Sequence, residues 1–273
     1  MVRTMTTPID TPTPTPMPAP AAEPTLDLAA PLRRADLRRA AGPLAVGVGD
    51  DVRDRVAVGR AFLRTVLGDD RAVYGATTGF GALVGFAGRD TEADQADNTL
   101  AHLGAGQGPD LDLRLVRAAL LVRTWSLARG VSGVSPHVVD ALVAMLATTF
   151  TPAVPRLGSV GASGDLIPLG AAAQALRGRG NAYVDGVRMP AADALAAAGL
   201  RPLPLDGRDA LALVNGTSLT TAALTLAADR VRGAHRAVLL LSCLLPGGLS
   251  PAFWLGGNSL NVSRNPRTRY CAA

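Results

Sequence analysis

The chain has 273 residues, of which 48% are hydrophobic, 18% are charged and only 4% are aromatic. This length suffices for one large or two modest domains with a substantial buried core. The formal net charge is +5 and every basic residue is arginine, but the arginines are spread along the chain and not gathered in a stripe with stacking aromatics. Composition and charge therefore argue against a nucleic-acid-binding protein.

Metal and membrane sites are also disfavoured. The three histidines stand alone in the sequence, and the two cysteines are distant from them, so neither a zinc site nor a disulfide framework is indicated. The longest apolar run, 237–245, is too short to span a bilayer, and the N-terminus lacks the apolar core of a signal peptide. We therefore expect no metal, no membrane segment and a cytoplasmic location.

The predicted elements begin after a biased tail. Residues 1–24 are rich in Thr, Pro and Ala, and alternating prolines favour extended, disordered chain. From 25 to 67 the pattern predicts short helices with Arg and Asp on their outer faces. Residues 72–74 then predict a short strand or extended piece that enters a glycine-rich loop, 75–88.

The middle of the chain is predicted to be helical. Residues 91–103 form one helix, which the glycines that follow terminate. Residues 112–129 show helical spacing of apolar side chains, which predicts an amphipathic helix that Gly130 ends. The arginines between its apolar positions are Arg114, Arg117 and Arg123.

Several shorter elements follow. Ser135 is predicted to cap a helix that runs to about residue 149. A loop rich in Pro and Gly follows, and Asp165 is predicted to cap the next helix, over 166–176. Residues 181–190 predict a hairpin around an Asp-Gly pair. A short helix over 191–198 precedes a long apolar helix, 208–245, interrupted near Asn215-Gly216.

The glycine-rich stretches do not match nucleotide-binding motifs. Residues 75–85 lack the Gly-Lys-Ser/Thr of a P-loop, and neither they nor 104–106 supply the third glycine of a dinucleotide-binding turn. Ser163 misses the Gly-x-Ser-x-Gly arrangement of a hydrolase nucleophile by one position. Both interpretations are weak.

The Ala162-Ser163-Gly164 sequence offers a different chemistry. In a tight enough bend, the Gly164 amide nitrogen can attack the carbonyl carbon of Ala162, because glycine permits the bend and alanine adds little bulk. Loss of water from the ring and from the Ser163 side chain leaves an electron-poor methylidene ring. Such a backbone is strained and needs rigid surroundings, to which flanking prolines contribute.

Residues 158–169, Gly-Ser-Val-Gly-Ala-Ser-Gly-Asp-Leu-Ile-Pro-Leu, resemble the signature of the aromatic amino-acid ammonia-lyases. This family comprises histidine, phenylalanine and tyrosine lyases with related aminomutases. Three further blocks agree in order: 74–81 resembles the loop of the catalytic Tyr, 98–108 the substrate-selectivity segment and 209–217 the Asn-Gly-Thr block. The resemblance extends over about residues 28–245.

The resemblance implies a role for each matching residue. Ala162, Ser163 and Gly164 would cyclise to 4-methylidene-imidazol-5-one (MIO), an internal prosthetic group, with no external cofactor. Tyr74 would be the general base that removes the β-hydrogen, which requires surroundings that stabilise phenolate. Asn215 would polarise or position the ring, although an Asn at a helix interruption can also simply bond to backbone.

The substrate side of the site is implied by Gly81, His102 and Leu103. The His102-Leu103 pair resembles the tyrosine-selective pattern, in which imidazole hydrogen-bonds the phenol hydroxyl and leucine packs against the ring. Phenylalanine lyases tend to have an apolar residue first, and histidine lyases have Ser then His. A histidine that caps or packs at a helix end is the alternative.

The resemblance also implies a fold class. This is the mainly α-helical, MIO-bearing N-terminal domain of the ammonia-lyase (fumarase/aspartase-like) fold, with a few short strands. We expect it over residues 25–205, followed by the truncated start of a long central helical bundle over 206–250 and a divergent irregular tail over 251–273.

Family members form homotetramers with sites at subunit contacts. We therefore expect a homo-oligomer, tetrameric in a full-length form, that acts on a small aromatic amino acid. A truncated non-catalytic fragment or interaction subunit, and an aminomutase, are the alternatives that the sequence leaves open.

Overall fold

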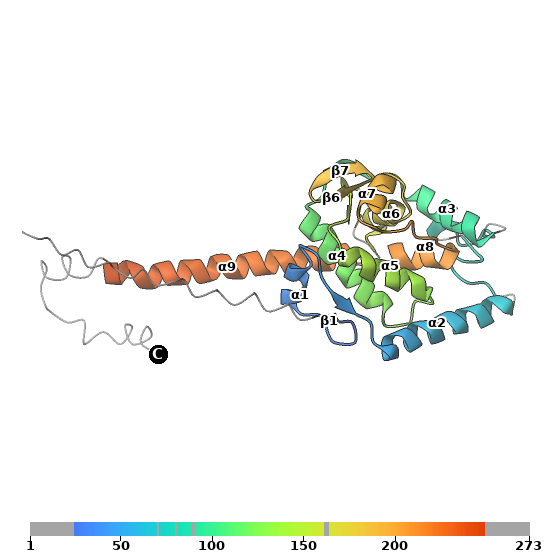
Figure 1. Ribbon diagram of the computed structural model, residues 1–273, viewed down its shortest axis with the longest axis horizontal. Coiled ribbons are helices and arrows are strands. Elements are labelled where there is room, and N and C mark those ends of the chain that lie inside the picture. Colours follow the sequence, from blue (N-terminus) through green and yellow to red (C-terminus); the bar gives the residue numbers. More distant parts are fainter. Residues whose placement is uncertain (1–24, 70, 80, 89–90, 161–163, 249–273) are drawn as a thin grey trace, which may run out of the picture.

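The computed structural model of the protein describes residues 25–69, 71–79, 81–88, 91–160 and 164–248, and it is mainly α-helical as expected (Figure 1). The helices in this part are α1 (Arg34–Arg39), α2 (Asp50–Gly68), α3 (Glu92–His102), α4 (Leu113–Leu127), α5 (Pro136–Leu146), α6 (Leu166–Leu176), α7 (Ala191–Ala197), α8 (Gly207–Val214) and α9 (Ser218–Gly248), with a 3-10 turn at Gly81–Leu83. The strands are β1 (Leu26–Asp27), β2 (Val46–Gly47), β3 (Gln107–Asp110), β4 (Thr151–Pro152), β5 (Pro155–Leu157), β6 (Asn181–Val184) and β7 (Val187–Pro190). The two predicted terminal tails lie outside the described residues.

The strands form three small sheets. β1 pairs with β2 in parallel, β3 pairs with β5 antiparallel, and β6 lies between β4 and β7 in an antiparallel sheet. The predicted hairpin is confirmed, because Asp185 and Gly186 join β6 to β7 with φ of 51° and 78°. Two residues of positive φ are what a tight two-residue hairpin turn requires. The hairpin packs on α7 (Figure 1).

Two helices begin at a polar residue whose side chain caps the first turn. The Thr91 side chain accepts from the Asp94 N–H (3.1 Å) at the start of α3, and Asp112 accepts from Arg114 N–H (2.8 Å) at the start of α4. Gly130, with φ of 76°, lies just beyond α4. The predicted helices over 91–103 and 112–129 are therefore confirmed to within a few residues.

The core lies among α4, α5, α6 and α8. Leu121 of α4, Leu142 of α5 and Phe150 are fully buried, and α8 buries nearly every residue in the same cluster. Because α8 packs between α3 and α6, the body of the fold continues past residue 205, where we expected the helical bundle to begin.

No strand forms at residues 72–74, where a turn begins at Tyr74, so the strand alternative is wrong. The backbone N–H groups of Ala76 and Thr77 both donate to the Val73 carbonyl (3.0 Å each). Gly75 follows Tyr74 with φ of 69°, a conformation that glycine adopts without strain. An aromatic and β-branched run of this length is too short to distinguish strand from turn.

Two arginines of α4 are buried, which the amphipathic pattern did not predict. Arg117 is 2% exposed and Arg123 is 6% exposed, whereas Arg114 lies at the surface. A guanidinium has five donors and can be buried where carbonyls accept them. Those of Arg117 donate to the carbonyl oxygens of Ala40, Gly42, Leu146 and Phe150.

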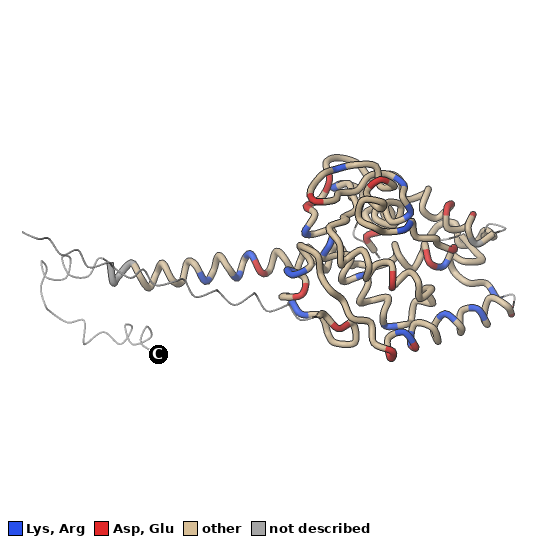
Figure 2. Tube along the Cα trace, viewed as in Figure 1, with Lys and Arg blue, Asp and Glu red and all other residues tan. Residues whose placement is uncertain are grey.

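Helix α9 starts against α4 and α1 and then extends away from the body (Figure 1). Its distal part carries no charged residue after Arg236 (Figure 2). By length and apolar composition the stretch Gly207–Leu244 could cross a membrane. A buried core helix of a globular protein has the same length and apolar composition, and α8, which forms the first part of this stretch, is buried in the core.

Candidate active site

Tyr74 lies in a glycine-rich loop that folds back on itself. Its phenol oxygen accepts a hydrogen bond from the Gly81 backbone N–H (2.7 Å), and Gly81 has φ of 58°. Tyr74 is 44% exposed, so its ring is accessible from outside. Two residues that the family resemblance assigned to the site are therefore in direct contact.

Helices α3 and α8 hold this loop from two sides. The amide nitrogen of the buried Gln95 of α3 lies 3.3 Å from the Gly75 carbonyl oxygen and 3.2 Å from that of Thr78, and donates to both. On the other side, a Cβ at Gly75 would overlap the Leu211 side chain of α8. Glycine at this position therefore lets the Tyr74 loop lie directly on α8.

Asn215 ends α8 beside Gly164. The Asn215 N–H donates to the Leu211 carbonyl (2.9 Å), and the residue then leaves the helix in an extended conformation. Gly164 is buried, and a Cβ built on it would lie 3.3 Å from Asn215 Oδ1 and 3.1 Å from the Gly216 nitrogen. The Asn-Gly turn and the last residue of the Ala-Ser-Gly sequence are therefore neighbours.

Asp165 ties this region to α9. Its N–H donates to the Gly216 carbonyl (2.8 Å), and its buried carboxylate accepts from Thr220 N–H (2.9 Å), Thr220 Oγ1 (2.7 Å) and Ser159 Oγ (3.1 Å). Thr220 is in the first turn of α9. The side chain therefore caps α9 and not α6, and the predicted cap of the 166–176 helix is wrong although that helix exists.

His102 and Leu103 lie in different surroundings. His102 is exposed at the end of α3, and its Nδ1 is 2.7 Å from the Asn98 carbonyl oxygen. Because a carbonyl oxygen only accepts, this contact requires that Nδ1 carries a proton. Leu103 is 8% exposed and packs against α6, where a Cβ at Gly170 would lie 2.8 Å from the Leu103 Cβ.

Arg123 is the buried cation next to this site, and no sequence motif marked it. Its guanidinium donates to the Ala212 carbonyl in the last turn of α8. A Cβ at Gly216 would overlap the same guanidinium. Burial, with a smaller effect from the nearby Arg208, lowers the pKa of Arg123 to about 10, so the side chain is cationic at neutral pH.

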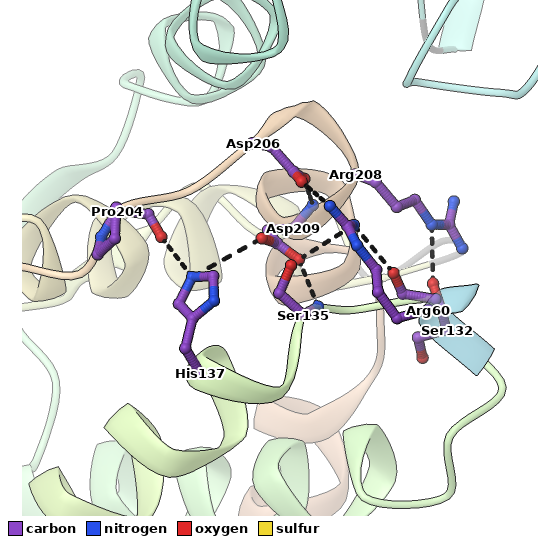
Figure 3. A network of polar contacts seen from close by, with 9 residues as sticks. Arg60, Ser132, Ser135, His137, Pro204, Asp206, Arg208 and Asp209 are labelled. Carbon is purple, nitrogen blue, oxygen red and sulfur yellow. Dashed lines mark hydrogen bonds and ion pairs between the residues drawn. The ribbon is translucent and has the colours of Figure 1, made fainter. Parts of the chain in front are cut away.

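A polar network holds the other end of α8 (Figure 3). Arg60 of α2 pairs with Asp206 and lies 3.7 Å from Asp209, which also accepts from the Ser135 N–H (2.7 Å). Burial and the neighbouring Asp206 carboxylate raise the pKa of Asp209. Ser135 thus contributes its backbone N–H here, and its side chain makes no cap at α5, contrary to our expectation.

Two hollows in the described part lie away from these residues: one of about 730 Å³ between α5 and residues 199–204, and one of about 660 Å³ between α1, α4 and α9. Ala162 and Ser163, which the sequence predicts to form the MIO ring, lie outside the described residues.

Known proteins resemble the chain in sequence. Residues 32–250 match the aromatic amino acid lyase family. The chain is 46% identical over 194 residues to a probable histidine ammonia-lyase of Halobacterium salinarum, and 41% identical over 209 residues to a tyrosine ammonia-lyase of Cereibacter sphaeroides. These alignments cover 69% and 76% of this chain but 36% and 40% of the relatives. The chain therefore spans less than half the length of either relative.

Solved structures share its fold. A phenylalanine aminomutase of Pantoea agglomerans superposes with a TM-score of 0.70 at 30% identity, over 76% of this chain and 40% of that one. A histidine ammonia-lyase of Trypanosoma cruzi superposes with a TM-score of 0.66 at 25% identity, over 74% and 40%.

The fold is therefore that of the ammonia-lyases and aminomutases, and the lyases of this class cleave carbon–nitrogen bonds. The chain belongs to the aromatic amino acid lyase family.

Proposed function

We propose that this chain carries the prosthetic-group half of an ammonia-lyase that eliminates ammonia from an aromatic L-amino acid, with tyrosine as the favoured substrate. The observation that carries the proposal is the contact between Gly164 and the Asn215 turn, at the end of the helix that also supports the Tyr74 loop. Three segments that are far apart in sequence meet around one helix, with polar groups where the proposed chemistry requires them.

The surroundings of Gly164 fit an MIO ring. Ring closure would join the Gly164 nitrogen to the Ala162 carbonyl carbon, and two waters would leave, one from the ring and one from the Ser163 side chain. A Cβ at Gly164 would lie in tight contact with the Leu166 side chain (3.0 Å), the Gly216 nitrogen (3.1 Å) and Asn215 Oδ1 (3.3 Å), and these groups would hold the ring. When formed, the group supplies an electrophilic carbon that makes the substrate amine a better leaving group.

Tyr74 would act as the base. The Gly81 amide donates to its oxygen at 2.7 Å and holds that oxygen in place. In its deprotonated, phenolate form, Tyr74 would take the proton from the β-carbon of the substrate and become the neutral phenol, a step for which a base must come within hydrogen-bond reach of that proton.

His102 supports tyrosine as the substrate. An imidazole side chain can hydrogen-bond the hydroxyl of a phenol, and His102 lies at the end of α3 with its Nδ1 on the Asn98 carbonyl oxygen. Phenylalanine has no such donor. The named relatives include both histidine and tyrosine ammonia-lyases, so the choice depends on this side chain.

The family pattern places further groups beyond the part that this chain matches: an Arg for the substrate carboxylate, a second Tyr, and a Gln, Phe and Glu around the ring. We propose a cytoplasmic homotetramer for the complete enzyme. In it the remaining groups would come from a longer gene product or a second polypeptide. A non-catalytic fragment or interaction subunit is the alternative.

Substrate choice is tested by incubating the complete enzyme, in which the longer gene product or second polypeptide supplies the remaining groups, separately with L-tyrosine, L-phenylalanine and L-histidine and following the unsaturated acid by absorbance. We expect the highest rate with L-tyrosine and a shift toward L-phenylalanine in H102F, with no shift in the matched control H235F on α9. Preference for L-histidine would contradict the assignment. Absence of product from a chain that contains the ring would favour the non-catalytic alternative.

An aminomutase is the second candidate, favoured by the superposition on a phenylalanine aminomutase. Its product would be a β-amino acid and not an unsaturated acid. Proton NMR of the same reactions distinguishes the two products.

A further inference from the structure

One buried cation, Arg123, contacts the Asn215-Gly216 turn and the end of α8 that precedes it. Arg123 projects from α4, is 6% exposed, and donates to the Ala212 carbonyl at the C-terminal end of α8. A cation at a helix C-terminus is favoured by the partial negative charge of the unpaired carbonyls there. Arg123 therefore stabilises the helix end from which Asn215 projects.

The same guanidinium shapes the turn itself. It occupies the space in which a Cβ of Gly216 would lie. The carbonyl of Gly216 in turn accepts from the Asp165 N–H (2.8 Å), and the Gly216 nitrogen and Asn215 side chain stand over Gly164. A continuous series of contacts thus leads from Arg123 through Gly216 to the residue whose nitrogen would close the ring.

The ordinary reason for a buried arginine does not explain Arg123. Arg117, two turns earlier on α4, donates to four backbone carbonyls. Arg123 has its Nε unpartnered within the described part of the chain, and no carboxylate there pairs with it. Burying a cation with so few partners costs stability. The hydrogen bond that Arg123 does make goes to the Ala212 carbonyl, next to the Asn215-Gly216 turn.

We infer that Arg123 is a positioning residue for the reaction: it fixes the Asn215-Gly216 turn against Gly164 and so sets the geometry in which the ring closes. The consequence for ring closure rests on the proposed function, whereas the consequence for the turn does not. Arg123 acts through Gly216 and Asn215 and need not touch substrate.

The experiment compares wild type with R123Q, G216A and R117Q. R117Q is the matched control, because it removes a buried arginine of the same helix that is not bonded to the α8 turn. G216A keeps Arg123 but forces its guanidinium away from the Ala212 carbonyl, which covers the case in which R123Q fails to fold. Each folded variant is measured by intact mass and by hydrogen–deuterium exchange.

We expect R123Q and G216A to keep the two water molecules that the wild type loses when the ring forms. In these two variants the amides of Asp165 and Asn215 should exchange about tenfold faster, as loss of a charged hydrogen bond implies. R117Q should be less stable, but it should lose the two water molecules as the wild type does, and exchange at these two amides should be unchanged. Unchanged exchange in R123Q and G216A, or equal effects from R117Q, would overturn the inference. A wild type that keeps both waters would refute ring formation, and the exchange measurement would still decide the role of Arg123.

Discussion

A single hydrogen bond fixes the phenol oxygen of Tyr74. The loop places the Gly81 backbone N–H at this oxygen while leaving the side chain 44% exposed. The proposed role of Tyr74 as the base requires an oxygen that is both held in position and accessible. This arrangement needs glycine at both positive-φ positions, Gly75 and Gly81.

If Tyr74 is the base, Y74F should lower the elimination rate by roughly 10²- to 10⁴-fold, the usual contribution of a general base. The ring should still form, because Tyr74 is not among the three residues that make it. Y183F is the matched control: it removes a hydroxyl that bonds to Asp110, and the activity should be retained. Equal activity of Y74F and wild type would exclude Tyr74 as the base.

Residue roles that depend on distant partners could not be predicted from the sequence. The Ala162-Ser163-Gly164 sequence indicated the chemistry and the family resemblance added Tyr74 and Asn215, and the described members of this set lie around α8. Asp165 and Ser135 occupy cap positions, but their actual partners, Thr220 and Asp209, are 55 and 74 residues away. Local capping rules do not include such partners.

At the scale of elements, α8 is the part that brings the site together. Its N-terminal end is fixed by Arg60 and Ser135, its middle contacts Gly75 through Leu211, and its C-terminal end is held by Arg123. Helices with clear apolar periodicity were predicted well. The burial of Arg123 was not, because the pattern of one helix does not reveal a carbonyl 89 residues away.

A second element contact predicts a pH dependence. Asp110 at the end of β3 accepts from Tyr183 Oη (2.7 Å) of β6 and Arg188 Nε (2.9 Å) of β7. Burial alone would raise the pKa of Asp110, but these two hydrogen bonds outweigh it and hold the pKa below its ordinary value. The carboxylate therefore stabilises the fold above the unfolded pKa of about 4, and this stabilisation is lost as the pH falls through the lowered pKa.

D110N should accordingly lower the free energy of unfolding by about 1–2 kcal/mol at neutral pH, and the difference from wild type should shrink in acid. Urea unfolding at a series of pH values measures this difference in the free energy of unfolding. D97N serves for comparison: Asp97 also has a lowered pKa, from the hydrogen bond of Arg177, but its side chain is 46% exposed and solvent screens the pair. A pH-independent effect of D110N would contradict the assignment.

At the scale of the whole molecule, the exposed face of α9 is the largest feature without a partner in the described residues. Leu224, Val231 and Val238 recur at seven-residue spacing and are 67%, 69% and 59% exposed. From 238 to 241 the helix is exposed and apolar on all sides. A helix of this kind is normally buried among others, which supports the proposed homo-oligomer.

We therefore expect the chain to self-associate through α9, as measured by light scattering after size-exclusion chromatography. V231E should weaken this association, because it places a charge in the apolar seam, while R232E, on the adjacent position outside the seam, should not. The fold of the body should be unchanged in both variants. A wild type that is monomeric at high concentration would count against the assembly.

The most direct measurement is the mass of the peptide that contains Ala162, Ser163 and Gly164. Tryptic cleavage after Arg156 and Arg177 releases residues 157–177 as one piece. We expect this peptide from the folded chain to be lighter than its sequence by two water molecules, and S163A, which has no hydroxyl to lose, to be unable to show the same loss. A wild-type peptide that retains both waters would contradict the proposal that this chain makes its own electrophile.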